Sequence, residues 1–295
     1  MRILLSGKNG QVGFELRRAL APLGEVFAVD QAECDLANEA AIRGLINDFS
    51  PDVIVNPAAY TAVDRAESDV DLAYAVNATA PRVLGEEAAK LGALVVHFST
   101  DYVFDGEKST FYTETDPTNP KSVYGASKLA GELALQSCGA KHLILRTSWV
   151  VGAHGGNFAK TMLRLASERE ALNVVADQFG APTSAALLAD LSAHLIREAV
   201  THSGDDFPLG LYHVVASGVT NWHEYACYVI ERARAAGYPI KVAPESILPI
   251  LSTQYPTPAR RPANSRLDTS KFRQSFGLNL PDWRLGIDHI LDQIL

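Results

Sequence analysis

Residues 3–13 read ILLSGKNGQVG, and this stretch decides the fold. The short apolar run Ile3–Ser6 is followed by three glycines in the spacing GxxGxxG, at Gly7, Gly10 and Gly13. The apolar run predicts a buried parallel strand, and the residues after the glycines have the pattern of a helix. Glycines between a strand and a helix permit a tight turn and a close approach of the backbone to phosphate. The stretch therefore predicts the first strand–loop–helix unit of a dinucleotide-binding sheet.

Strands and helices continue to alternate through the first 150 residues. Further buried strands are predicted at Val26–Val29, Val53–Asn56, Leu94–Phe98 and Leu143–Arg146. Helical patterns occupy residues 12–23, 36–49, 70–91 and 124–138. This alternation predicts an α/β fold, a Rossmann-type doubly wound parallel sheet that binds ligands beyond the carboxyl ends of its strands.

The pattern changes after Trp149. Helices are predicted over 158–170, 185–199 and 222–236, a strand over 211–216, and a proline-rich stretch over 244–262. We therefore expect an NAD(P)-binding Rossmann domain over 1–150, to which 180–217 returns. Residues 151–179 and 218–295 are expected to form a smaller mixed C-terminal lobe that binds the substrate.

Composition excludes several classes of protein. The 295 residues are 47% hydrophobic and 20% charged, and 26 basic against 34 acidic residues give a net charge of −8. These fractions are typical of globular proteins, and general nucleic-acid binding is not expected of an acidic chain. Three scattered cysteines form no disulfide framework, and no apolar run has the length of a signal peptide or a membrane helix. We expect a cytoplasmic protein.

Several residues near the glycine loop are candidates for binding the cofactor. Asp30 ends the second strand, where a carboxylate accepts hydrogen bonds from the adenosine ribose and repels a 2′-phosphate. This position favours NADH, but Lys8 can offset the repulsion, so NADPH stays open. The further cofactor candidates are Asn9, Gln11, Val12, Asp35, Leu36, Ala58, Ala59 and Thr61.

A second group of residues can carry chemistry. Ser99 and Thr100 end a strand, and Tyr124 and Lys128 stand four apart at the start of a predicted helix. A spacing of four places both side chains on one helix face. The Lys128 charge is expected to lower the pKa of Tyr124 toward neutral pH, so that the phenol can protonate a developing alkoxide. His97, inside the apolar strand, is expected to be a core histidine.

Together these motifs resemble the extended short-chain dehydrogenase/reductase superfamily, and within it the dTDP-4-dehydrorhamnose reductase family. The stretches that carry the resemblance are GKNGQVGFEL, VNPAAYTAVDRAE, STDYVFDG, VYGASKLAGE, LRTSWV, NFAKTMLRLA, DQFGAPT and YPTPARRPANSRLD. They lie between residues 7 and 268 and so cover nearly the whole chain. STDYVFDG and PARRPANSRLD are more specific than the cofactor motifs.

The resemblance implies transfer of a hydride from NADPH or NADH to carbon 4 of a dTDP-linked 4-keto-6-deoxy sugar. The sugar would be dTDP-4-dehydro-L-rhamnose and the product dTDP-L-rhamnose, a precursor of polysaccharides. By similarity, Tyr124 is the proton donor, Thr100 holds the carbonyl oxygen, and Lys128 orients the cofactor and the tyrosine. Val63, Asp101 and Trp149 would line the sugar site.

A basic segment near the C-terminus is a candidate for binding the diphosphate. Residues 256–271 hold four basic residues and one acidic residue, a local charge of 4 − 1 = +3 in a chain of −8. Guanidinium groups pair with phosphate oxygens in a forked geometry. We therefore predict that Arg260 and Arg261 bind the substrate. The alternative is an exposed basic loop that pairs with the acidic surface.

The resemblance also implies a homodimer that holds Mg²⁺ through glutamates. Glu15 matches one of these glutamates, whereas Ala186 stands where the family motif has the second. The metal and the dimer therefore both stay open.

Two other functions also stay open. A nucleotide-sugar epimerase or 4,6-dehydratase of the same superfamily would use similar motifs, but dehydration needs an Asp-Glu pair where this chain has Asp101 and Tyr102. A non-catalytic regulatory subunit would only bind the dinucleotide. Such a subunit need not keep Thr100, Tyr124 and Lys128, which are all present and favour an enzyme.

Overall fold

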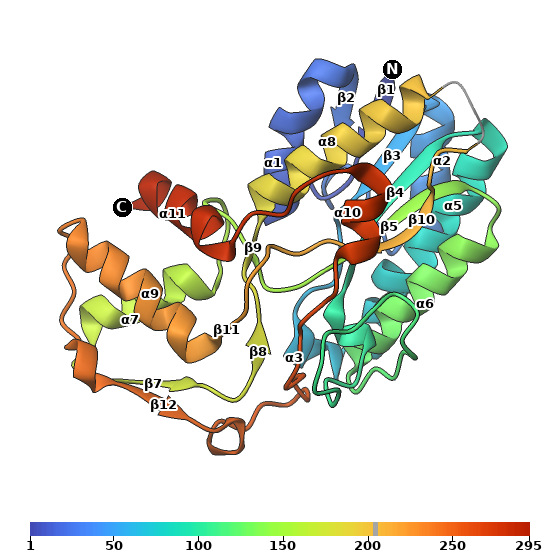
Figure 1. Ribbon diagram of the computed structural model, residues 1–295. Coiled ribbons are helices and arrows are strands. Elements are labelled where there is room, and N and C mark those ends of the chain that lie inside the picture. Colours follow the sequence, from blue (N-terminus) through green and yellow to red (C-terminus); the bar gives the residue numbers. More distant parts are fainter. Residues whose placement is uncertain (203–205) are drawn as a thin grey trace.

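A parallel sheet of six strands forms the centre of the molecule (Figure 1) in a computed structural model that describes residues 1–202 and 206–295. Its strand order is β10-β5-β4-β3-β1-β2, and each neighbouring pair is parallel. The strands are β1 (Arg2–Leu5), β2 (Glu25–Ala28), β3 (Val53–Asn56), β4 (Leu94–Thr100), β5 (Lys141–Thr147) and β10 (Gly210–His213). Strands β3 and β4 are buried along their whole length, as their apolar runs predict.

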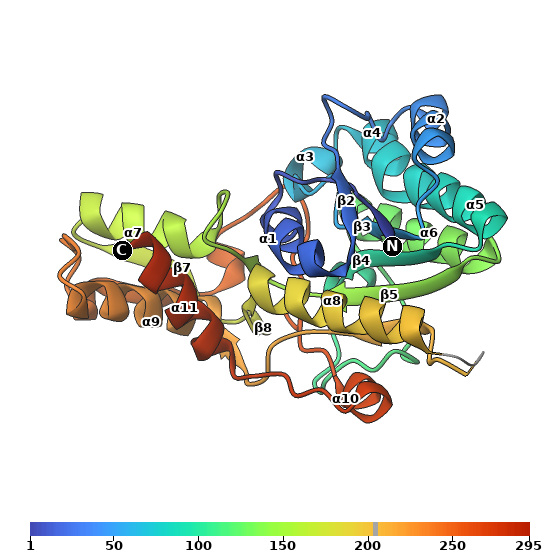
Figure 2. The same cartoon turned by 90° about the horizontal axis from the view of Figure 1, so that it is seen from above.

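Helices cover both faces of this sheet (Figures 1 and 2). One face packs against α2 (Glu39–Phe49), α5 (Ala80–Leu91) and α6 (Val123–Ser137). The other face packs against α1 (Gln11–Leu20), α8 (Ala185–Thr201) and α10 (Ser270–Phe276). Apolar side chains from the sheet and the helices form one continuous core on each side. The predicted α/β fold with a Rossmann-type parallel sheet is confirmed.

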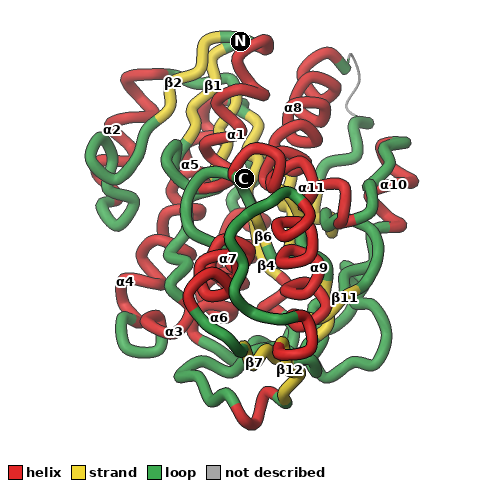
Figure 3. Tube along the Cα trace, turned by 90° about the vertical axis from the view of Figure 1, so that its left-hand side faces the viewer, coloured by secondary structure: helices red, strands yellow, loops and turns green. Residues whose placement is uncertain are grey.

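A smaller lobe lies beyond one end of the sheet (Figures 1 and 2), and it stands in front of the sheet in Figure 3. Its helices are α7 (Phe158–Glu168), α9 (Trp222–Ala235) and α11 (Trp283–Ile294). Three two-stranded sheets pair β7 (Leu172–Val175) with β12 (Ile247–Ile250), β6 (Val150–Val151) with β9 (Thr183–Ser184), and β8 (Phe179–Gly180) with β11 (Thr220–Asn221). The lobe has apolar clusters of its own. In the described part of the chain, no helix combines the length and the apolar character needed to cross a membrane.

Two details of the chain path differ from the sequence pattern. The helix expected over 70–91 is divided into α4 (Val70–Tyr74), a π-helical turn (Ala75–Thr79) and α5. Asn77 lies in that turn, where its amide oxygen accepts from the Tyr60 N–H at 2.8 Å and its amide nitrogen donates to the Ser127 hydroxyl at 3.0 Å. Helix α10 packs against the central sheet, although it lies within the range 218–295 that the sequence assigns to the lobe.

Candidate active site

The glycine loop has a backbone that only glycine can supply at two positions. Gly7 has a φ of +61°, and a Cβ added there would lie 2.9 Å from the Ala58 Cβ. A Cβ on Gly13 would lie 1.9 Å from the Gly7 carbonyl oxygen. Helix α1 begins after Gly10 with no side-chain cap, so its first N–H groups are free to bind an anion. This cradle fits the diphosphate of a dinucleotide.

Lys8 belongs to this loop, and Asp30 lies beside it, two residues after the end of β2. The Asp30 carboxylate accepts hydrogen bonds from the backbone N–H groups of Asn9 at 3.2 Å and Gln31 at 2.8 Å. Lys8 pairs with Glu33 at 2.5 Å, and this contact lowers the pKa of the Glu33 carboxyl. Because Glu33 neutralises the Lys8 charge, Lys8 does not offer an unpaired cation that would attract a 2′-phosphate to the site beside Asp30.

The other predicted cofactor residues follow strands β1, β2 and β3 in the chain. Asp35 caps the backbone N–H of Ala37 at 3.0 Å, and Leu36 packs at the edge of the core under α2. Ala59 and Thr61 lie in the connection between β3 and α3 (Val63–Ala66), next to Ala58. Val12 lies in the first turn of α1.

A loop from the second half of the chain lies against the glycine loop, which the sequence analysis missed. The Gln11 side-chain oxygen accepts from the Gly152 N–H at 2.8 Å and from the Asn157 amide at 3.0 Å. The His154 ring stacks on Phe14, with 4.3 Å between ring centroids. No local pattern could reveal these contacts, since more than a hundred residues separate the partners.

Thr100 and Asp101 follow the buried run of β4 and are themselves buried. The Thr100 hydroxyl donates to the Asp101 carboxylate at 3.1 Å and accepts from the Tyr102 N–H at 3.2 Å. Burial raises the pKa of the Asp101 carboxyl to about 6, and the hydrogen bond from Thr100 partly opposes that shift.

Tyr124 stands in the first turn of α6 and meets the end of β4. Its ring lies edge-on to Tyr102, with 5.4 Å between centroids. Burial raises the pKa of the Tyr124 phenol, and the neighbouring Thr100 side chain opposes part of that rise. The structure therefore brings together Thr100, Asp101 and Tyr124, as the sequence predicts.

Lys128 does not lower the pKa of Tyr124 in this structure, so that expectation is wrong. The Lys128 Nζ donates to the Phe98 carbonyl oxygen at 2.6 Å and lies 3.2 Å from His97 Nε2. Burial lowers the pKa of Lys128 itself to about 8. Because the ammonium is turned toward β4, desolvation dominates at the phenol and its pKa rises.

Val63 and Trp149, two of the residues expected to line the sugar site, come from separate connections after β3 and β5. Val63 begins α3. Trp149 has a φ of +48°, a left-handed conformation that is costly for a residue with a side chain. Its ring stacks on Trp222 at 3.7 Å, and Gly180 leaves room for it, since a Cβ there would come within 2.8 Å of the indole. Trp222 is a neighbour that the sequence analysis missed.

The two arginines predicted to bind a diphosphate both have acidic partners. Arg261 pairs with Asp64 at 2.6 Å and donates to the Tyr102 hydroxyl at 3.2 Å. Arg260 is more exposed and pairs with Glu107 at 2.9 Å. Arg261 thus lies close to the tyrosines of the site, and the role of both side chains toward a diphosphate stays a prediction.

The residues around Glu15 do not fit a magnesium ion within one chain. The Glu15 carboxylate faces Arg18 at 3.5 Å, so it already has a cationic partner. Over residues 1–202 and 206–295, no three or more His, Cys, Asp or Glu side chains are grouped so that they could hold a metal.

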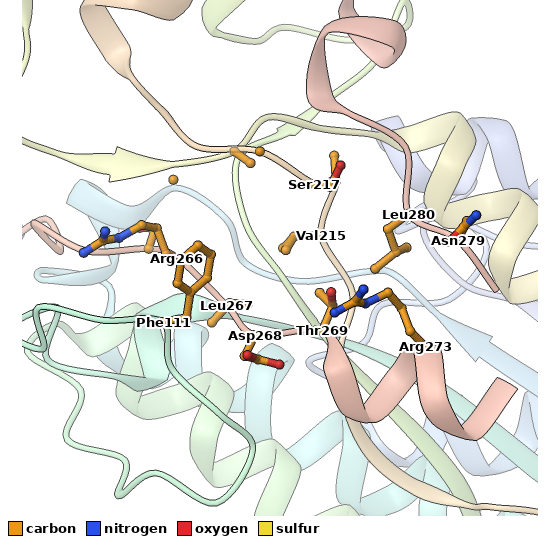
Figure 4. A pocket seen from close by; sticks show the side chains of 15 residues that line it. Phe111, Val215, Ser217, Arg266, Leu267, Asp268, Thr269, Arg273, Asn279 and Leu280 are labelled. Atoms are coloured by element: carbon orange, nitrogen blue, oxygen red, sulfur yellow. The ribbon is translucent and has the colours of Figure 1, made fainter. Parts of the chain in front are cut away.

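A cavity of about 430 Å³ opens near the end of β10 (Figure 4). Its wall includes Gly180 and Ser265, and Arg266 and Arg273 stand at opposite ends of it. The lining residues do not include Thr100, Tyr124 or Lys128. The cavity therefore does not contain these three side chains, although its wall residue Gly180 packs against Trp149.

Comparison with known proteins identifies relatives over the whole chain. The model of a family described as the RmlD substrate binding domain matches residues 1–295. The dTDP-4-dehydrorhamnose reductase of Escherichia coli K12 is 53% identical over 100% of this chain and 98% of its own. The enzyme of the same name from Burkholderia thailandensis is 49% identical over 97% of each chain.

Solved structures give the same result. A dTDP-4-dehydrorhamnose reductase from Clostridium acetobutylicum superposes with a TM-score of 0.89 at 36% identity, over 99% of both chains. The Bacillus anthracis enzyme, solved in complex with NADP, also has a TM-score of 0.89, at 34% identity over 99% of both chains. The chain therefore belongs to the dTDP-4-dehydrorhamnose reductase family of NAD(P)-dependent oxidoreductases.

Proposed function

We propose that the protein reduces the 4-keto group of dTDP-4-dehydro-L-rhamnose to give dTDP-L-rhamnose, with NADPH or NADH as the reductant. The observation that carries the proposal is the meeting of the Thr100 and Tyr124 side chains at the carboxyl end of β4. That end of a parallel sheet is where ligands bind, and the glycine loop follows β1 at the same edge. Relatives of the same name, similar over their full length, support the substrate.

The Thr100 hydroxyl and the Tyr124 phenol have different roles at the substrate carbonyl. When bound, the dinucleotide supplies the hydride that goes to carbon 4. The Thr100 hydroxyl turns its one hydrogen from the Asp101 carboxylate to the carbonyl oxygen and holds that oxygen beside the Tyr124 phenol. The raised pKa of Tyr124 keeps its proton in place at neutral pH, so the phenol is an acid in the resting site. As the oxygen becomes an alkoxide, its proton affinity exceeds that of the phenolate, and the proton moves to it.

The surrounding residues bind and orient the two ligands in this proposal. The glycine loop and the start of α1 hold the dinucleotide diphosphate, and Asp30 holds the adenosine ribose. Lys128, one turn after Tyr124, is proposed to bind the second ribose. Val63, Asp101 and Trp149 line the sugar site, and Arg260 and Arg261 bind the substrate diphosphate.

The domain division, the location and the assembly are parts of the same proposal. Residues 1–150, with 180–217, hold the cofactor, and 151–179 with 218–295 hold the nucleotide sugar. We infer a cytoplasmic location, which the free thiols of Cys34, Cys138 and Cys227 support. A homodimer is inferred from the resemblance alone.

An epimerase or dehydratase is the second candidate. A UDP-glucose 4-epimerase from Thermus thermophilus, solved with NAD, shares the fold with a TM-score of 0.76, but at 24% identity it supports the fold alone. Dehydration needs a second acidic side chain after Asp101. Tyr102 stands there, and its hydroxyl accepts a hydrogen bond from Arg261. The geometry therefore favours the reductase.

A coupled assay tests the proposal. The purified protein is given a dTDP-6-deoxy-4-keto sugar, a 3,5-epimerase and NADPH or NADH, and the absorbance of the reduced cofactor is followed. Cofactor consumption that requires all components supports the reductase. No consumption with either cofactor contradicts it. Stoichiometric NAD in the purified protein, without net consumption of added cofactor, would instead support an epimerase.

A further inference from the structure

Two tryptophan rings that are far apart in the sequence lie face to face. The ring centroids of Trp149 and Trp222 are 3.7 Å apart, and the planes differ by 18°. Trp149 follows β5 of the central sheet, whereas Trp222 is the first residue of α9 in the lobe. Phe158 also packs against Trp222, with 4.6 Å between centroids. We propose that Trp222 is a positioning residue that holds the Trp149 ring in place for the sugar of the substrate.

Trp222 is itself held by several contacts. Its indole nitrogen donates to Gln178 Oε1 at 3.1 Å. The preceding residue, Asn221, belongs to β11, which pairs with β8, and its side chain caps α9 by accepting from the Glu224 N–H at 2.8 Å. Gln178 belongs to the stretch DQFGAPT, so this stretch acquires a role in holding Trp222. The Trp222 ring is therefore a fixed surface on which the Trp149 ring packs.

Trp149 needs such support because its backbone is strained. Its φ of +48° is left-handed, and a residue with a side chain keeps this conformation only where its surroundings enforce it. The Trp149 carbonyl oxygen accepts from the Thr183 N–H at 3.2 Å, and Gly180 leaves room for one edge of the indole. These contacts fix the main chain and that edge. The stack on Trp222 fixes the plane of the ring.

The consequence concerns binding of the sugar, and this step rests on the proposed function, in which Trp149 lines the sugar site. The Trp149 side chain is half-buried, and Trp222 covers one of its faces. The accessible part of the indole therefore lies away from Trp222, where a pyranose ring can pack on it. Contacts of this kind are the same before and during hydride transfer, so losing them raises KM and leaves kcat nearly unchanged.

Two variants of Trp222 separate positioning from folding. Trp222→Ala removes the stack, and KM for dTDP-4-dehydro-L-rhamnose should rise about fivefold, the equivalent of one aromatic pair. The kcat and the dissociation constant of NADPH should stay within a factor of about three. Trp222→Phe keeps a ring at this position and should bring KM back to within about twofold of the wild-type value.

Tyr238→Ala is the matched control, because Tyr238 is a partly buried aromatic residue that packs against the same apolar cluster as Trp222. It should lower the melting temperature without raising KM. An unchanged KM in Trp222→Ala, or an equal rise in Tyr238→Ala, would overturn the proposal. A wild-type protein that consumes no cofactor would instead contradict the proposed function.

Indole NMR on the whole protein tests the stack without turnover. The chain has three tryptophans, so labelling with ¹⁵N-tryptophan gives three indole signals, and Trp149→Phe identifies the Trp149 signal by its loss. The wild-type protein should show nuclear Overhauser contacts between the rings of Trp149 and Trp222. Added dTDP-L-rhamnose should shift the Trp149 signal and leave that of Trp283 in place. Missing ring contacts, or an unmoved Trp149 signal, would overturn the proposal even if the Trp222 variants do not fold.

Discussion

Gly13 lies directly over Gly7 in the cofactor loop. A Cβ on residue 13 would come 1.9 Å from the Gly7 carbonyl oxygen and 2.8 Å from its carbonyl carbon. Neither backbone atom can move without changing the turn that joins β1 to α1. The first and third glycines of the motif therefore fix one turn together, and the shape of the anion cradle depends on both.

Gly13→Ala should therefore disturb the cradle. We expect NADPH binding to weaken at least about tenfold, measured by the change in nucleotide fluorescence, because the loop must open to admit the methyl group. Gly44→Ala is the matched control, since nothing lies within 4 Å of a Cβ at that helical position. It should leave binding unchanged and add up to about 1 kcal/mol of stability. Equal binding by both variants would contradict the assigned cradle.

Asp30→Asn tests which cofactor the loop prefers. The substitution removes the negative charge beside the adenosine ribose while the side chain keeps its shape. Because a carboxylate repels a 2′-phosphate, the ratio of kcat/KM for NADPH to that for NADH should rise by about tenfold. Steady-state rates with both cofactors measure this ratio. An unchanged ratio would show that Asp30 does not lie beside the adenosine ribose.

Tyr124→Phe removes the proposed proton donor and keeps the ring. Turnover should fall at least about 100-fold, the lower end for one acid–base group. The dissociation constant of NADPH should stay within a factor of about three. Tyr102→Phe is the control, since this neighbouring ring lies 5.4 Å away and its hydroxyl contacts Arg261. If both variants lost turnover equally, Tyr124 would have no special role as an acid.

Asp101 gives stability a pH dependence of defined sign. Its pKa in the folded protein is about 6, above its ordinary value of 3.8, so the folded state binds more protons than the unfolded state between these values. The contribution of Asp101 to stability is therefore largest below about pH 4 and is lost as the pH rises through 6. The loss is about 3 kcal/mol, from 1.36 kcal/mol per pKa unit.

Asp101→Asn should remove this dependence. Urea unfolding of both proteins between pH 4 and 7, without ligands, gives the difference in their unfolding free energies. We expect the wild-type protein to lose stability relative to the variant as the pH rises across this range. A difference that is flat with pH would show that Asp101 is not the buried carboxyl that titrates.

The sequence was sufficient for features whose physical cause is local. The strand at Val53–Asn56 and the start of α7 at Phe158 follow from apolar periodicity, and the glycine spacing identifies the loop after β1. Tyr124 and Lys128 were found because a spacing of four on a helix is a local pattern.

Features that depend on packing between distant parts of the chain could not be predicted from the sequence. The sequence predicts only that His97 is a core histidine. No local pattern shows that β3 and α6 place Asn56 and Lys128 on either side of its ring. The prediction of a lowered Tyr124 pKa was wrong for the same reason, since desolvation of the phenol depends on all the residues packed around it. Arg261 was assigned to phosphate by composition, while its Asp64 partner lies almost two hundred residues away.

Transfer of a labelled hydride tests the central claim most directly. The protein is supplied with dTDP-4-dehydro-L-rhamnose and with NADPH or NADH that carries deuterium at nicotinamide carbon 4, in each face of the ring in turn. The sugar nucleotide is then analysed by mass spectrometry and proton NMR. The proposed function predicts one deuterium at sugar carbon 4 from one of the two labelled faces. A sugar nucleotide that gains no deuterium, while the 4-keto signal persists, would contradict it.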